Sequence, residues 1–311
     1  MHRSFLVKII CYSALLALCT TFAKPMQAQS GQAISEAEEK LKQLFDGIME
    51  TIDDEKRISS GDQFSALLQQ TLTMDESFVY PFPLLPNLSK LTSPEKRFRI
   101  YTWNVPLHSG MNRFYGLIQL KSTTKDTTTV IELVDQGNGI SNPDEAILTP
   151  ERWYGAIYYQ LIPNQTGQGR EFYTLLGWRG ENILMTIRLI DILTITPGGE
   201  ICFGQPLFCQ YGETNSVRII FRHSANVSMS LRYEEQWMVT DKKWNSRHKE
   251  FKYTREKTWI IVCDRLVPAD PQLENQYENY IPAGDVMDGF LFRDRCWHFI
   301  EQIDVRNPGK K

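Results

Sequence analysis

The stretch between positions 264 and 288 gathers the side chains of this sequence that are best suited to chemistry. Two carboxylates can serve as acid and base around a glycosidic bond, and rings such as those of Tyr277 and Tyr280 can stack on a sugar. The carboxylates available here are Asp264, Asp270, Glu274, Glu278, Asp285 and Asp288. The same composition is also typical of a solvated loop that a few rings anchor, and we favour this second interpretation.

Other patterns that could carry catalysis or bind a metal are incomplete. The histidines are isolated, so none forms the i, i+4 pair of a metalloprotease helix. His223 and Ser224 are neighbours, but adjacent residues of a strand face opposite ways, and the GxSxG turn of hydrolases is absent. The segment 135–145 lacks ligands that a calcium-binding loop requires, which favours a turn. We therefore expect neither a metal nor a cofactor.

The first 28 residues have the layout of a secretory signal peptide. Basic residues come first, an apolar run follows over 9–18, and cleavage is expected after Ala23 or Ala28. The run is shorter than the ~20 residues that span a bilayer, so we expect no transmembrane anchor in the mature chain. Lipidation at Cys19 is a weaker alternative. The expected location is the periplasm, the outer membrane or the cell exterior.

Four cysteines remain after processing: Cys202, Cys209, Cys263 and Cys296. An even number in an oxidising compartment favours disulfides, with three possible connectivities. A hairpin turn at Gln205-Pro206 would place Cys202 opposite Cys209, and Cys263 would then pair with Cys296. Buried thiols are the alternative, and the spacing does not fit a zinc site.

Two helices and an extended segment are expected before the β-rich part of the chain. Apolar residues recur every three or four positions over 34–52 and 60–72, and capping boxes at Ser35 and Ser60 mark the starts of these helices. This helical segment covers 29–78. Prolines then predict an extended strap over 79–96, and we expect the apolar stripes and the strap to pack on the fold.

From position 97 onward, short runs rich in Val, Ile, Thr and aromatic residues alternate with turn residues. No helical pattern is interleaved, which favours antiparallel pairing. The run 185–195 has the length of a buried helix, but its branched residues favour a strand. The expected strands are 98–105, 113–121, 127–134, 153–162, 171–178, 185–195, 217–222, 228–233, 258–263 and 289–303. We predict a mainly β fold over 97–308, antiparallel and sandwich- or curved-sheet-like, with a small helical segment before it.

Composition narrows the classes of partner. Hydrophobic residues make up 42% of the chain, which is enough for a core, and the formal net charge is −3. Nucleic acids and anionic membranes attract proteins through a basic excess, so this charge gives no reason to expect either partner. The basic segment 242–252 is expected to form an exposed hairpin tip.

Several short sequence words carry a resemblance over residues 60–308. They are LTSP at 91–94, RIYTWN at 99–104, WYGAIYY at 153–159, YTLLGW at 173–178, SMSLRY at 228–233, DRLVP at 264–268 and IDVRNP at 303–308. With these words the chain resembles a family of uncharacterised exported proteins from Bacteroidota-type bacteria. The resemblance implies no activity, cofactor or active site. The cysteines depart from the family pattern, so any bridge would be a local stabilising addition.

These observations lead to two functional hypotheses. The first is an exported envelope or secreted protein that binds a glycan or an envelope partner through its β surface and performs no catalysis. The alternative is an envelope hydrolase, acting on glycans, that uses carboxylates within 264–288. A pocket that holds two of these carboxyl groups ~5–10 Å apart would favour the hydrolase.

Overall fold

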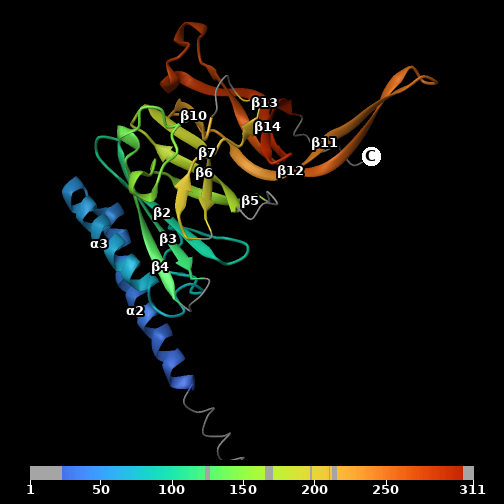
Figure 1. Ribbon diagram of the computed structural model, residues 1–311. Coiled ribbons are helices and arrows are strands. Elements are labelled where there is room, and N and C mark those ends of the chain that lie inside the picture. The colour runs from blue at the N-terminus through green and yellow to red at the C-terminus, as the bar shows by residue number, and fades with distance from the viewer. Residues whose placement is uncertain are drawn as a thin grey trace, which may run out of the picture. The chain divides into compact units, whose positions relative to one another are not determined.

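The computed structural model of the protein describes residues 23–122, 127–164, 171–196, 198–209, 211 and 216–303 (Figure 1). The expected signal segment up to position 22 and the end of the expected β domain from position 304 lie outside the described residues. The chain divides into two compact units. The first comprises Met1–Asn87 and Lys121–Val130, and the second comprises Leu88–Leu120 and Ile131–Lys311.

Two helices, α2 (Ala23–Glu50) and α3 (Asp54–Leu72), pack together in the first unit. The expected starts at Ser35 and Ser60 are wrong, because both residues lie inside helices. Helix α3 is instead capped by the Asp53 carboxylate, which accepts a hydrogen bond from the Lys56 amide at 3.1 Å. None of the helices in the described part of the chain has the length and apolar character needed to cross a membrane.

Glu38, on α2, joins this helix to the segment that follows α3. Its buried carboxylate accepts hydrogen bonds from the Tyr80 hydroxyl at 2.8 Å and the Leu84 amide at 2.7 Å. These bonds hold the proline-rich strap against α2, and Phe82 and Leu85 are buried there while its prolines remain exposed. The strap is shorter than expected, because strand β1 begins at Ser89.

The strands form three sheets within the described residues, antiparallel except for one parallel pair. The first sheet has the order β1 (Ser89–Thr92), β2 (Phe98–Pro106), β3 (Asn112–Lys121), β4 (Thr128–Val134). The second has the order β10 (Ile219–Ser224), β7 (Met185–Ile195), β6 (Glu171–Gly180), β5 (Ile157–Asn164), with β8 (Ile201–Phe203) also on β7. The third has the order β11 (Leu231–Asn245), β12 (Glu250–Pro268), β13 (Tyr280–Arg293), β14 (Cys296–Ile303), β9 (Phe208–Cys209). The prediction of a mainly antiparallel β fold is confirmed.

The second sheet is the middle layer of its unit, with the first sheet on one side and the third on the other (Figure 1). Strand β7 shows this best, since Leu189 and Leu193 pack toward the first sheet while Ile190 and Ile192 pack toward the third. A strand buried on both faces needs apolar residues at nearly every position. This explains why 185–195 lacks alternation, and its prediction as a strand is confirmed.

A buried ion pair lies within this middle layer. Arg218 and Asp191 are fully buried, and their Nε and Oδ1 atoms are 2.9 Å apart. The Tyr158 hydroxyl donates to the other oxygen of Asp191 at 2.9 Å and accepts from the Trp153 indole at 3.0 Å. Burial lowers the pKa of Arg218, but the Asp191 carboxylate outweighs it and the pKa is raised.

The segment 135–145 is organised by an arginine. Buried Arg179 donates to the Asp135 carboxylate at 3.2 Å and to the Asn138 side chain at 2.8 Å. Its guanidinium also lies 4.9 Å from the centre of the Phe114 ring and 5.2 Å from that of Tyr154. The prediction of a turn here is confirmed by a short 3-10 helix, Gly137–Gly139.

Both ends of the third sheet differ from the prediction. The expected single strand 289–303 is two strands, joined at Asp294 and Arg295, whose positive φ angles of 53° and 66° suit a two-residue hairpin turn. Strands β11 and β12 extend far beyond the expected runs 228–233 and 258–263, and pair as far as Asn245 and Glu250. We call residues 235–259 the ribbon. Its end confirms the hairpin tip expected near 242–252.

The structure contains one disulfide among the described cysteines, and it joins Cys209 to Cys296 with their Cα atoms 5.9 Å apart. The expected pairs 202–209 and 263–296 are therefore wrong, and Cys202 and Cys263 are unpaired. The reason is topological. Strand β8 joins the second sheet and β9 the third, so Gln205-Pro206 connects two sheets and forms no hairpin. Strand β13 separates Cys263 on β12 from Cys296 on β14.

Candidate functional site

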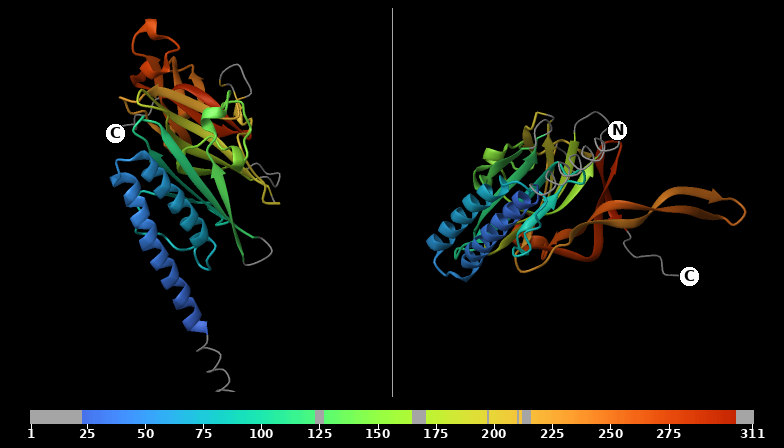
Figure 2. Two further views of the ribbon diagram at one scale, coloured as in Figure 1. Left: turned by 90° about the vertical axis from the view of Figure 1, so that its left-hand side faces the viewer. Right: turned by 90° about the horizontal axis from the view of Figure 1, so that it is seen from below.

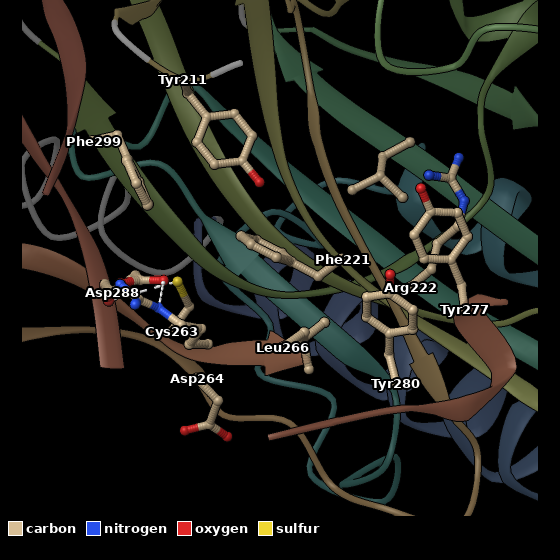
Figure 3. A pocket seen from close by; sticks show the side chains of 12 residues that line it. Tyr211, Phe221, Arg222, Cys263, Asp264, Leu266, Tyr277, Tyr280, Asp288 and Phe299 are labelled. Carbon is tan, nitrogen blue, oxygen red and sulfur yellow. Dashed lines mark hydrogen bonds and ion pairs between the residues drawn. The ribbon is translucent and has the colours of Figure 1, made fainter. Parts of the chain in front are cut away.

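A cavity of about 290 Å³ lies between β10 of the second sheet and the strands β12, β13 and β14 of the third (Figure 3). Its volume is at the lower end of the range for small-molecule sites. Aromatic side chains dominate its wall. The lining residues are Tyr211, Ile220, Phe221, Arg222, Cys263, Asp264, Arg265, Leu266, Tyr277, Tyr280, Asp288 and Phe299.

One wall of the cavity is a cluster of rings around buried Phe290. The ring of Phe290 lies 5.3 Å from those of Tyr211 and Phe299 and 6.5 Å from that of Phe221. These rings come from separate strands and from the segment after β9, and their tilted and edge-on contacts are those that aromatic pairs prefer. Burial, with nearby acidic groups, raises the pKa of Tyr211 to about 12, so its hydroxyl is a neutral hydrogen-bonding group.

The opposite part of the wall pairs two tyrosines with an arginine. Tyr277 lies in the 3-10 turn η4 (Tyr277–Asn279), Tyr280 begins β13, and their ring centroids are 5.1 Å apart. The Tyr280 hydroxyl accepts a hydrogen bond from the Asn275 amide at 3.2 Å, which fixes the preceding turn. The Arg222 guanidinium lies 5.8 Å from the centre of the Tyr277 ring. No carboxylate of the described residues forms an ion pair with Arg222.

Asp288 is a structural residue of the cavity wall. Its carboxylate accepts hydrogen bonds from the Arg265 Nε at 3.0 Å and from the Gln302 amide at 2.8 Å. A further bond joins it to the terminal nitrogen of Arg265 (dashed in Figure 3). The hydrogen bond to Asp288 is the main cause of the raised pKa of Arg265. Because its oxygens are occupied and its charge is balanced, Asp288 is poorly placed to act as an acid or base.

Asp264 is also held, on the other side of β12. Its carboxylate accepts a hydrogen bond from the Ser230 amide at 2.7 Å, while its own amide donates to the Ser230 carbonyl at 3.1 Å. Figure 3 shows this carboxylate directed away from the ring cluster and from Asp288. The two carboxylates that the cavity brings together therefore do not face each other across it.

The thiol of Cys263 is the remaining nucleophilic group of the cavity. It is buried and donates a weak hydrogen bond to the Asp288 carbonyl at 3.6 Å. Burial, followed by the negative charges of Asp288 and Asp264, raises its pKa far above the ordinary value. A thiol in this environment stays protonated at neutral pH and is inert.

The other carboxylates singled out in the sequence do not enter the cavity. Asp270 is exposed and accepts a hydrogen bond from the Gln272 amide at 2.8 Å, which caps the short turn Pro271–Leu273. Glu274 and Asp285 are exposed, and Glu278 is half-buried in η4. Solvation and turn capping account for these positions.

A second group of donor atoms meets at the disulfide. The sulfur atoms of Cys209 and Cys296 and a ring nitrogen of His298 lie within 4.8 Å of one another. Cysteine binds zinc or copper(I) as the thiolate, and the bond between the two sulfurs leaves neither thiolate available.

Most of the cavity wall is not evident from the sequence. Tyr277 and Tyr280 were singled out as sugar platforms, but Tyr211, Arg222 and Phe299 were not. These three come from three separate segments, and their meeting depends on which strands become neighbours.

The chain matches no protein-family model, no curated protein and no solved structure.

The chemistry that this wall offers is recognition. Rings provide flat apolar surfaces, phenolic hydroxyls can donate and accept hydrogen bonds, and Arg222 provides a guanidinium that forms no ion pair with a carboxylate of the described residues. Such a set can stack on a ring and bind an anionic group.

Proposed function

We propose that the protein is an exported binding protein that takes a small acidic glycan fragment, a sugar ring bearing a carboxylate or phosphate group, in the cavity between β10 and β12–β14. One observation carries this proposal: an aromatic cavity holds an arginine without an ion-pair partner among the described residues, while its carboxylates are already bound. The cavity volume, close to the lower end of the range for small-molecule sites, agrees with a small ligand.

Tyr277 and Tyr280 have the positions suited to stacking. Their adjacent rings form a platform for the apolar face of a sugar. Arg222, beside this platform, would bind the acidic group through charge-assisted hydrogen bonds, which are about twice as strong as neutral ones. The ligand's hydroxyl groups would meet the phenol of Tyr211.

The hydrolase alternative has less support. It requires a carboxylic acid and a carboxylate on opposite sides of the scissile bond. Here the Asp288 carboxylate is occupied by Arg265 and the Gln302 amide, and Asp264 is held by Ser230. Neither has a free oxygen directed at the Tyr277–Tyr280 platform.

Export is part of the proposal. A disulfide between distant strands is typical of proteins that fold in an oxidising compartment, and Cys209–Cys296 supports this location. Membership of the exported Bacteroidota-type family that the sequence resembles would agree with it.

The test is a glycan array that contains neutral, uronic-acid and phosphorylated sugars, followed by calorimetry with the best ligand. We expect acidic sugars to bind, and Arg222→Gln to weaken binding about tenfold, the loss of one charge-assisted contact. Tyr277→Ala should weaken the binding of neutral and acidic sugars alike. Arg255→Gln, on the ribbon and outside the cavity, is the matched control. Binding of acidic sugars that Arg222→Gln leaves unchanged would contradict the proposed site.

A further inference from the structure

The ribbon gathers its aromatic residues on one face. Cross-strand partners share a face of a sheet, and successive residues of a strand alternate between faces. Trp244 pairs with Phe251, and Tyr253 lies two residues further along β12. By the same register Trp237, opposite Lys257, and Trp259, opposite Glu235, lie on this face too. We call it the aromatic face. The other face carries polar pairs such as Gln236 with Thr258.

A β-bulge keeps this face continuous. Trp237 and Val239 occupy odd positions of β11 and Trp244 an even one, so in a regular strand they would lie on opposite faces. The register shifts between Val239 and Asp241, which inserts Thr240 as an extra residue. The shift brings Trp244 back to the same face as Trp237 and Val239.

The aromatic face is exposed along most of its length. Exposed fractions of the side chains of Trp237, Val239, Trp244, Phe251, Tyr253 and Trp259 lie between 37% and 54%. Between Glu250 and Ile260, β12 has only β11 as a neighbour among the described strands. Figures 1 and 2 show the ribbon projecting from the third sheet. Exposed apolar surface concentrated on one face typically marks an interaction site.

The rings of this face are ordered by contacts with one another and with the core. Trp244 and Phe251 lie 4.9 Å apart at the tip. At the base, Trp259 lies 5.1 Å from Tyr233, whose ring lies 6.3 Å from that of buried Trp297. The face is therefore preformed, and docking would cost little conformational entropy.

The tip of the ribbon is strongly basic, in contrast to the whole chain. Between positions 242 and 255, Lys or Arg occurs at 242, 243, 247, 249, 252 and 255, and Glu250 is the acidic residue. The formal charge of the complete protein is −3. Averaging over the chain hides this local concentration, so the net charge by itself does not indicate an anionic membrane.

We propose that the ribbon docks on an anionic lipid bilayer, with the aromatic face in the headgroup region and the basic tip against anionic headgroups. Trp and Tyr favour this region because their rings are apolar and their N–H and O–H groups are polar. Basic residues near a negatively charged leaflet add to the attraction. Binding then combines buried apolar area with electrostatic attraction, as in interfacial amphipathic elements.

The shape of the element favours a bilayer over a single-stranded nucleic acid. Proteins that bind single strands stack bases within a basic groove that follows the backbone. The ribbon is a projecting two-stranded element, and the cavity of this unit lies elsewhere, between β10 and β12–β14. A flat surface fits one exposed face of such an element.

The test is sedimentation of the full chain with vesicles of phosphatidylcholine alone and with anionic phosphatidylglycerol added. We expect binding only to the anionic vesicles, weakening as salt rises. Trp244→Ala with Phe251→Ala, and separately Arg247→Gln with Arg255→Gln, should each weaken binding about tenfold or more. Trp emission should shift to the blue in the parent protein on binding.

Matched controls separate the ribbon from general stickiness. Ile183→Ala with Leu184→Ala removes an exposed apolar pair from another hairpin, and Lys40→Gln with Lys42→Gln removes the same charge from α2. Both should bind like the parent. Equal binding to neutral vesicles, unchanged binding of both ribbon variants, or tighter binding to single-stranded DNA than to anionic vesicles would each overturn the proposal. Melting temperatures confirm that every variant is folded.

Discussion

Burial sets the protonation of single residues in the cavity wall. The Tyr211 hydroxyl and the Cys263 thiol are both held in their neutral forms, because the charged forms would be poorly solvated and would face nearby carboxylates. The cavity therefore presents neutral hydrogen-bonding groups beside Arg222, while Arg265, the other arginine of the wall, is paired with Asp288. This is a combination suited to binding.

The pKa of Tyr211 predicts a loss of stability at alkaline pH. A tyrosine with a pKa of about 12 in the folded state and about 10 when unfolded keeps its full contribution below pH 10 and loses it as pH rises toward 12. Between pH 9 and pH 11 the free energy of unfolding should fall by about 1 kcal/mol more in the parent than in Tyr211→Phe. Urea unfolding at both pH values measures this, and equal losses would contradict the assignment.

The buried pair of Arg218 and Asp191 predicts a large cost of removing one partner. Arg218→Met leaves a carboxylate buried without its cation, so we expect a loss of about 3–5 kcal/mol in the free energy of unfolding. Arg222→Met, four residues further along in β10 and without an ion pair among the described residues, is the control and should cost under about 1 kcal/mol. Chemical denaturation compares the two variants. Similarly small losses in the free energy of unfolding of both variants would mean that the ion pair is not needed for stability.

At the scale of elements, the disulfide decides how the third sheet is closed. Strand β9 is only two residues long, yet it pairs in parallel with β14, and Cys209–Cys296 lies at that pairing. So short a strand adds few hydrogen bonds to the sheet. The covalent bond fixes its place.

We therefore predict that the disulfide contributes strongly to stability. It closes a loop with a sequence separation of 87 residues, and Cys209→Ser with Cys296→Ser should lower the free energy of unfolding by about 4 kcal/mol on the chain-entropy model. Cys202→Ser, at an unpaired half-buried position, should change little. Peptide mapping without reduction must also find the 209–296 link; a 202–209 link would refute this topology.

The bulge in β11 gives a second prediction at this scale. Deleting Thr240 removes the extra residue, so β11 should alternate regularly with Trp237, Val239 and Trp244 still on one face. The neighbouring Val239 is exposed, so the melting temperature should stay within a few degrees of the parent. Vesicle binding should therefore stay close to that of the parent. A loss of binding as large as in the Trp244→Ala, Phe251→Ala variant would show that the bulge itself, and not the continuous face, is what binding needs.

At the scale of the whole molecule, the sequence predicts those features that local patterns of residues control. The continuous apolar run of β7 predicted a buried strand because both of its faces are covered. The pairing of Cys209 with Cys296 and the meeting of Tyr211, Arg222 and Phe299 were missed, because they depend on which distant strands become neighbours. The sequence predicted strands that are too short for the ribbon, because its outer half is polar and its bulge interrupts the alternation of Trp237, Val239 and Trp244.

The tryptophans report on the molecule as a whole. Trp103, Trp153 and Trp297 are buried, whereas Trp237, Trp244 and Trp259 are exposed on the ribbon. Acrylamide should therefore quench the ribbon tryptophans preferentially in the folded protein and all of them after unfolding. Changing the three ribbon residues to Phe should remove most of the quenchable emission, as Stern–Volmer plots would show. Trp178, the seventh tryptophan, is partly buried and should be quenched weakly. Persistent strong quenching would contradict the burial of Trp103, Trp153 and Trp297.

The Cys209–Cys296 bond also affects how the chain survives proteolysis. The loop it closes contains β10 to β13, and with them most of the cavity wall and the whole ribbon. A cut at the ribbon tip, for example after Arg247, would fall inside this loop, so the two pieces would remain one covalent molecule. A nicked chain would migrate as a single species until a reductant separated its halves. Cleavage of this exposed ribbon would thus leave the chain covalently joined.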